Sequence, residues 1–148
     1  MQTFTRNASL VAALVALLAA PAVAHHSFAM YDMNQTKTYT GKLTRYIPGA
    51  NHAQLLFDLL DNDGKPIMKD GKPSTMGVET GSAANLSRQG VTVESFPVGT
   101  IITVTAHPLR DGRPFGAMQG ELIKCGKEMP KGGCTKATGQ VFLTGSAQ

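Results

Sequence analysis

Hydrophobic and polar residues alternate along several short stretches of the chain, a pattern typical of half-buried β-strands. In the second stretch, Leu55, Phe57 and Leu59 form one fully apolar face, and the residues that alternate with them form a face that is only partly apolar. Gly41 lies in the middle of the first stretch and predicts a bulge or sharp bend there. The predicted strands cover residues 38–46, 53–60, 75–80, 100–107 and 116–123, and residues 140–144 add a possible edge strand.

Turn and cap residues divide these strands. Ser82 is suited to cap a short helix over residues 83–89, which Gly90 would close. Asp61-Asn62-Asp63-Gly64 predicts a turn, which residues 69–73 prolong into a long soluble loop. Ahead of the first strand, residues 28–35 form a lead-in segment, which we expect Phe28, Met30 and Tyr31 to anchor.

Five strands with one short helix between the third and fourth favour an all-β protein with an OB-fold-like barrel. The OB-fold is a small Greek-key barrel, and two of its loops flank one ligand-binding face. The alternative is another small antiparallel barrel or sandwich with a different strand order.

The first 24 residues have the features of a secretory signal peptide. Arg6 provides the positive start, residues 10–20 form an apolar run, and Ala22-Val23-Ala24 is a small-residue cleavage site. The run is short for a membrane span, although an uncut anchor is the alternative. We therefore predict a periplasmic or secreted protein with no transmembrane segment after cleavage. A cut after Ala22 is a second possibility.

The mature chain is predicted to contain one domain, residues 25–123, and a carboxy-terminal extension, residues 124–148. Cys125 and Cys134 are the only cysteines, and export favours a disulfide between them. The chain-entropy model gives such a short loop about 2.5 kcal/mol. The alternative, a two-thiolate metal site, has an unusually wide spacing.

Charge and composition exclude some functions. The chain has 14 Lys and Arg against 10 Asp and Glu, and these are scattered. The balance argues against a nucleic-acid partner, and the absence of Trp argues against a stacking platform. Ser82 follows Gly81 outside any G-x-S-x-G motif, and no phosphate-binding glycine loop is present. We therefore do not expect an enzyme.

Four histidines are the candidate ligands of a metal ion. Cleavage after Ala24 would place the free amine beside the side chains of His25 and His26. His52 and His107 fall at strand ends, in the two loops that flank the ligand face of an OB-fold. Such a nitrogen-rich site favours copper, with zinc or nickel as alternatives. Glu79, at the end of the third strand, could add an oxygen ligand or orient an imidazole.

Each of these residues also has a structural interpretation. His52 could cap a strand, and His107 could bond to a loop carbonyl. Glu79 could pair with Arg45 or Arg88.

Two other functions remain open. One is a non-enzymatic barrel that binds a small ligand or a periplasmic protein partner. The other is a copper oxidase of the histidine-brace kind, which the absence of aromatic platform residues disfavours.

Several segments together resemble a family of small exported bacterial proteins known as domain of unknown function 6152. The resemblance spans residues 25–123, and it implies export and the domain boundaries but no activity. This chain has Ala50-Asn51-His52-Ala53 where the family usually has Asn-Pro-His-Ala, so Asn51 stands at the position of the proline. It has Met76-Gly77 where a tryptophan usually precedes the Val-Glu pair. The matching segments are His25 to Asp32, Thr40 to Leu43, Asn51 to Ala53, Val78 to Ser82, Thr103 to Pro108 and Arg110 to Gly112.

Overall fold

The computed structural model describes residues 28–143, apart from the side chain of Leu143. The predicted signal peptide and the histidines at positions 25 and 26 lie outside this range. Residues 31–143 form one compact unit. Its elements are β1 (Lys37–Ile47), β2 (Gln54–Leu59), β3 (Met68–Lys69), β4 (Lys72–Pro73), β5 (Thr75–Glu79), α2 (Ala83–Arg88), β6 (Ile101–Pro108), β7 (Phe115–Lys124) and β8 (Gln140–Leu143).

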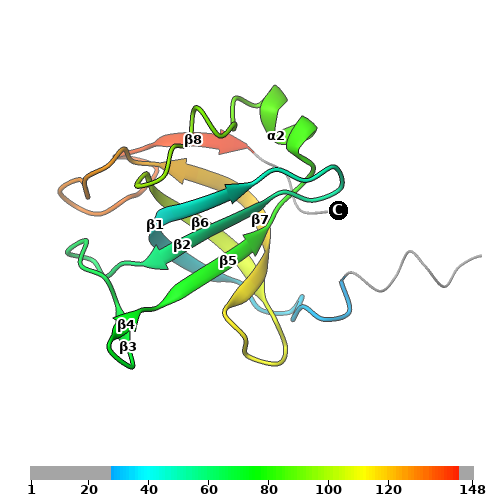
Figure 1. Cartoon of the computed structure of the whole chain (residues 1–148), viewed down its shortest axis with the longest axis horizontal. Helices are drawn as coiled ribbons and strands as arrows, with labels where there is room; N and C mark the ends of the chain where they lie inside the picture. The colour runs from blue at the N-terminus through cyan, green and yellow to red at the C-terminus, as the bar shows by residue number, and fades with distance from the viewer. Residues whose placement is uncertain (1–27, 144–148) are drawn as a thin grey trace, which may run out of the picture. The chain divides into compact units, whose positions relative to one another are not determined.

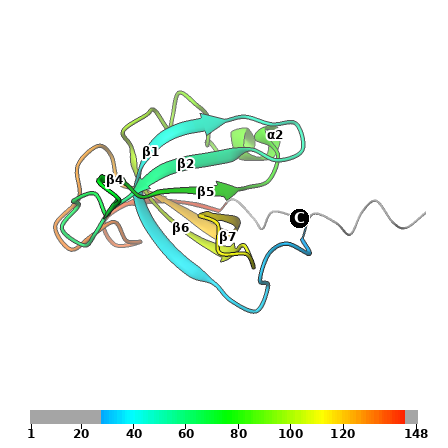
Figure 2. The same cartoon turned by 60° about the horizontal axis from the view of Figure 1, so that its bottom comes forward.

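Five of the strands close into a barrel. They run in the order β5-β2-β1-β6-β7, and β7 returns to pair with β5. Neighbours are antiparallel except β5 and β7, which are parallel. Figure 2 shows β2, β5 and the second part of β1 on one side of the barrel, and β6, β7 and the first part of β1 on the other. With α2 between the third and fourth barrel strands, this is the predicted OB-fold arrangement, and the prediction is confirmed.

Side chains from alternate positions of these strands fill the barrel. Leu55, Phe57 and Val78 are fully buried, as the alternating pattern predicted. Gly41 is needed for close packing, because a Cβ there would overlap the Phe57 ring. The predicted bulge occurs elsewhere, since the register between β1 and β2 shifts at Leu43 to Arg45.

The helix α2 covers one end of the barrel (Figure 1). Its N-cap is Ser82, whose hydroxyl accepts a hydrogen bond from the Asn85 amide at 3.2 Å. Leu86 is its fully buried residue and belongs to the main core. Phe96 completes this end and makes an edge-on contact with Phe142, with ring centroids 5.0 Å apart. The predicted helix and cap are confirmed.

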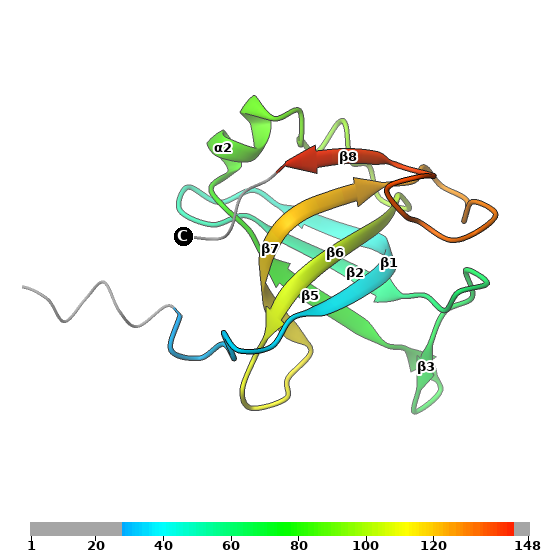
Figure 3. The same ribbon diagram turned by 180° about the vertical axis from the view of Figure 1, so that it is seen from behind.

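The carboxy-terminal segment packs beside β7. β8 pairs with β7 outside the five-stranded barrel (Figure 3). The predicted disulfide joins Cys125 and Cys134, whose Cα atoms are 5.7 Å apart. Cys134 packs with Leu60, Ile101 and Ile123 in a second, smaller apolar cluster. The disulfide therefore ties the end of β7 to the segment that leads into β8.

The connection from β2 to β5 differs from the predicted plain loop. Its first part is the expected turn, in which a carboxylate oxygen of Asp61 accepts hydrogen bonds from the amides of Asp63 and Lys65. Its second part is a two-stranded hairpin of β3 and β4. The hairpin turns at Asp70 and Gly71, both of which have positive φ. Glycine adopts this conformation easily, and aspartate tolerates it better than most residues.

Candidate functional site

A row of outward-facing residues crosses four strands of the barrel. Glu79 on β5 pairs with Gln54 on β2 and with Ala117 on β7, and Ala117 pairs with His107 on β6. The row faces outward because Val78, the neighbour of Glu79, lies in the core and successive strand residues alternate in direction. Two strand spacings separate His107 from Glu79, a backbone distance of about 10 Å.

His52 lies beside Glu79, just before β2 begins. Its Nδ1 is 3.1 Å from the Thr80 carbonyl oxygen and 3.7 Å from a Glu79 carboxylate oxygen. A carbonyl oxygen only accepts, so Nδ1 carries the proton and donates it, and the Nε2 of a neutral ring keeps its lone pair. The Glu79 contact is too long for a hydrogen bond and becomes an ion pair only if the ring is protonated.

Backbone bonds hold this loop against the end of β5. The amide of Ala53 donates to Gly81, and the amide of Thr80 donates back to Ala53. The hydroxyl of Thr80 adds a buried bond to the Ala53 carbonyl at 3.0 Å. The His52 side chain is therefore fixed at its base, yet 29% of it remains exposed.

His107 is held in the same way but is buried. Its Nδ1 is 2.7 Å from the carbonyl oxygen of Gln35, in the lead-in segment. The residue is 8% exposed. Asp32 adds a second tie, because its amide donates to the Pro108 carbonyl at 2.8 Å. The sequence allowed that His107 could bond to a loop carbonyl, and this is the contact observed. It holds the lead-in segment on β6.

Tyr31 connects the lead-in to Glu79 and was predicted only as an anchor. It is 1% exposed and forms an isolated bridge with Leu109. Burial, followed by the negative charge of Glu79 and a side-chain hydrogen bond to it, raises the pKa of Tyr31 to about 12. The phenol therefore stays protonated and donates to the carboxylate. The anchoring role is confirmed for Tyr31, whereas Met30 is 49% exposed.

The predicted site residues are thus only partly brought together. His52 and Glu79 are neighbours, and among residues 28–143 Glu79 makes no salt bridge with Arg45 or Arg88. His107 does not join them, since the described residues contain no cluster of three His, Cys, Asp or Glu side chains able to hold a metal. His25 and His26 lie outside these residues, so the four-histidine site stays a prediction.

The alternative of a thiolate metal site is removed. Both cysteines of the chain are in the disulfide, and neither is free. Over the part of the chain that the structure describes, no helix has the length and apolar character needed to cross a membrane.

The fold and this outer row define the class of protein: a small closed β-barrel of OB-like topology with a histidine–carboxylate pair on its wall. A comparison with protein families identifies the family of the chain. The model of DUF6152, described as a family of unknown function, matches residues 12–118. The chain therefore belongs to this family, as its motifs indicated. No curated protein and no solved structure matches it.

Proposed function

We propose that the protein is an exported barrel that binds a transition-metal ion through His25, His26 and His52, with Glu79 as an oxygen ligand or orienting partner. The ion is copper, with zinc and nickel as alternatives. The observation that carries the proposal is the geometry of His52, which lies 3.7 Å from Glu79 and bonds through Nδ1 to a carbonyl. The activity is binding, without a catalysed reaction, in the periplasm or outside the cell.

The hydrogen bond of His52 suits a metal ligand. Histidines that bind metals through one ring nitrogen usually donate the other N–H to a carbonyl or carboxylate. The bond to Thr80 leaves Nε2 with a lone pair, and the side chain is partly exposed. A nearby carboxylate adds the negative charge that favours binding of a cation. Imidazole nitrogens suit copper, zinc and nickel.

The tether between Tyr31 and the terminal histidines also supports the proposal. Tyr31 bonds to Glu79 through its side chain. His25 is six positions before Tyr31 in the sequence, and six residue steps extend at most about 21 Å. A chain of this length would allow an amino terminus at His25 to reach His52. The amine and two imidazoles would supply the ligands that His52 and Glu79 alone lack.

The test is calorimetric titration of Cu(II) and Zn(II) into protein that begins at His25. His52→Ala should weaken binding at least about tenfold, the usual size of a lost ligand or ligand support. A version with one glycine added before His25 should also weaken it, because it moves the amine while keeping every side chain. Equal affinities for the wild type and these two variants would contradict the proposal.

A third variant, His107→Gln, decides whether His107 is a metal ligand. The glutamine keeps a hydrogen-bond donor for the Gln35 carbonyl. Loss of affinity in this variant, with folding unchanged, would make His107 the fourth ligand. Unchanged affinity would leave it as the anchor of the lead-in. The remaining alternative is a barrel that binds a protein partner. A pull-down from periplasmic extract in the presence of chelator tests it, because a defined partner retained without metal would favour a protein-binding module.

A further inference from the structure

A cavity of about 380 Å³ opens at the end of the barrel away from α2. It lies between the start of β1, the end of β6 and the loop that joins β6 to β7. Ligand sites in proteins typically have volumes of about 300–1,000 Å³. None of the proposed metal ligands lines it.

The floor of the cavity is apolar. Tyr39, Leu59 and Met76 come from the adjacent strands β1, β2 and β5. Met76 belongs to the main core, and Tyr39 and Leu59 pack against that core while remaining partly exposed. At the opposite end, the same core is covered by Leu86 and its neighbours. At the base of this cavity Met76 is almost fully buried, and the accessible apolar surface belongs to Tyr39 and Leu59.

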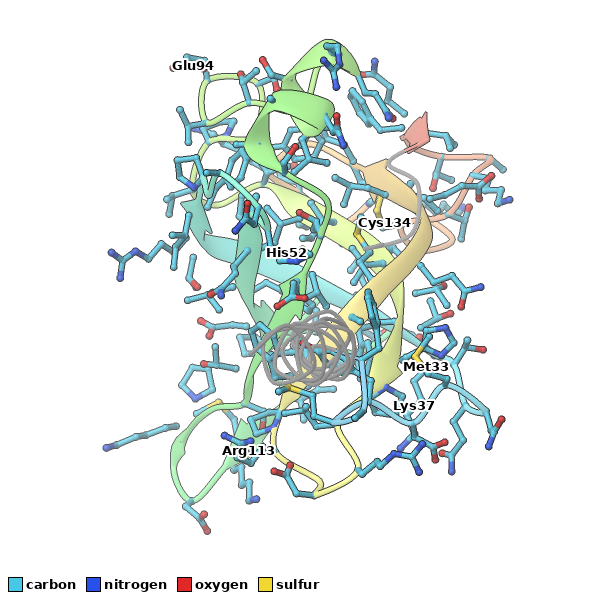
Figure 4. All side chains as sticks on the ribbon, turned by 90° about the vertical axis from the view of Figure 1, so that its right-hand side faces the viewer. Met33, Lys37, His52, Glu94, Arg113 and Cys134 are labelled. Carbon is cyan, nitrogen blue, oxygen red and sulfur yellow. A yellow bond between two sulfur atoms is a disulfide. The ribbon has the colours of Figure 1, made fainter. Side chains whose placement is uncertain are left out.

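The rim of the cavity is mainly cationic. Lys37, Arg110 and Arg113 line it, with Asp32 as the one acidic side chain. Arg113 is paired with Asp111 at 2.7 Å. Lys37 and Arg110 form no salt bridge within residues 28–143. Figure 4 shows Lys37 and Arg113 at the same end of the barrel, the end away from α2.

We propose that this cavity binds a small amphiphilic anion, a free carboxylic acid with a medium-length apolar chain. The carboxylate would lie between Lys37 and Arg110, and the chain would cover Tyr39, Leu59 and Met76. Two cations without a salt-bridge partner attract the head group, and the open apolar floor favours burial of the tail. The cavity fits one such ligand, so binding is one to one.

The experiment uses decanoate as the probe, titrated calorimetrically into the full mature chain in the presence of chelator. The chelator separates this proposal from metal binding, which would be absent in the same buffer. Decanoate should bind, and decanol, which has the same chain without the charge, should bind at least about tenfold more weakly, the equivalent of about 1.4 kcal/mol. Added salt should weaken the binding of decanoate and leave the binding of decanol unaffected.

The variants test both parts of the cavity. Lys37→Gln with Arg110→Gln should reduce decanoate affinity at least about tenfold and leave decanol unchanged. Leu59→Ala should weaken both ligands, with circular dichroism to verify the fold. Lys127→Gln with Lys131→Gln, on the exposed disulfide loop, is the matched control for lost charge. Equal decanoate binding by the two double variants would overturn the proposal. So would binding of phosphatidylglycerol vesicles but not of decanoate, which would indicate a lipid surface instead.

Discussion

His52 and His107 make the same hydrogen bond in different surroundings. Each ends or precedes a barrel strand, and each donates from Nδ1 to a backbone carbonyl, at 3.1 Å and 2.7 Å. His52 bonds to Thr80 at the end of the neighbouring strand and lies beside Glu79. His107 bonds to Gln35, which is 72 residues away in the sequence, and has little exposed surface.

The comparison shows that ring orientation alone does not define a ligand. The bond fixes the tautomer of both side chains, and exposure then decides what the free nitrogen can reach. His52 has an exposed ring with a carboxylate beside it, which suits an incoming cation. His107 is enclosed, and in the described structure its bond to Gln35 holds the lead-in segment. The first histidine is available for function because other bonds hold its loop.

The largest expected effect is the loss of metal-linked stability in His52→Ala. A ligand that binds only the folded state adds about 2.7 kcal/mol at one hundred times its dissociation constant. Urea unfolding of the mature protein with and without Zn(II) should show a gain of this size. His52→Ala should lose most of the gain. Its stability without metal should fall by only about 1 kcal/mol, the net value of the lost bond to Thr80.

His107→Gln provides the control, because it should keep the metal-linked gain if the two histidines differ as described. A His52→Ala protein that is stabilised by zinc as much as the wild type would make the two histidines equivalent. The distinction between them would then fail.

The second effect is a loss of stability without metal in His107→Ala. The substitution removes a buried ring and leaves the Gln35 carbonyl without its donor, which should cost about 2 kcal/mol. Urea unfolding in chelator measures this cost, and His107→Gln should recover part of it. A change below about 0.5 kcal/mol would show that the lead-in is held by Tyr31 and Asp32 alone.

The strands were predictable because their burial is local in sequence. In β2, Leu55 and Phe57 alternate with less buried residues, and one face of a strand must be apolar to pack. The β3–β4 hairpin was missed because Met68–Lys69 and Lys72–Pro73 are exposed and too short to show any alternation. Gly41 was predicted to mark a bulge or a sharp bend, because sequence does not reveal that the Phe57 ring needs the space beside it.

Only those site residues that lie at predicted strand ends could be placed from the sequence. The positions of His52 and Glu79 at adjacent strand ends followed from the predicted fold, and the structure brings them together. The link from Tyr31 to Glu79 depends on the path of the lead-in, which no periodic pattern encodes. The carbonyl that accepts from His107 was likewise unpredictable, because Gln35 reaches it only through that path.

The smallest effect concerns Tyr31, which connects the lead-in segment to the Glu79 carboxylate beside His52. In the unfolded chain the phenol has a pKa of about 10, and in the folded protein its pKa is raised to about 12. The unfolded state therefore loses this proton first as pH rises. Stability from this group is complete below about pH 10 and declines as pH rises towards 12.

Tyr31→Phe keeps the buried ring but removes the hydroxyl. It should cost about 1 kcal/mol at neutral pH, the net value of a typical hydrogen bond. Its stability should then fall less steeply than that of the wild type in urea unfolding between pH 9 and 11.5. Burial also raises the pKa of Tyr39, so Tyr39→Phe controls for tyrosine ionisation elsewhere. If Tyr31→Phe and the wild type lost stability at the same rate with pH, the bond to Glu79 would not hold the lead-in.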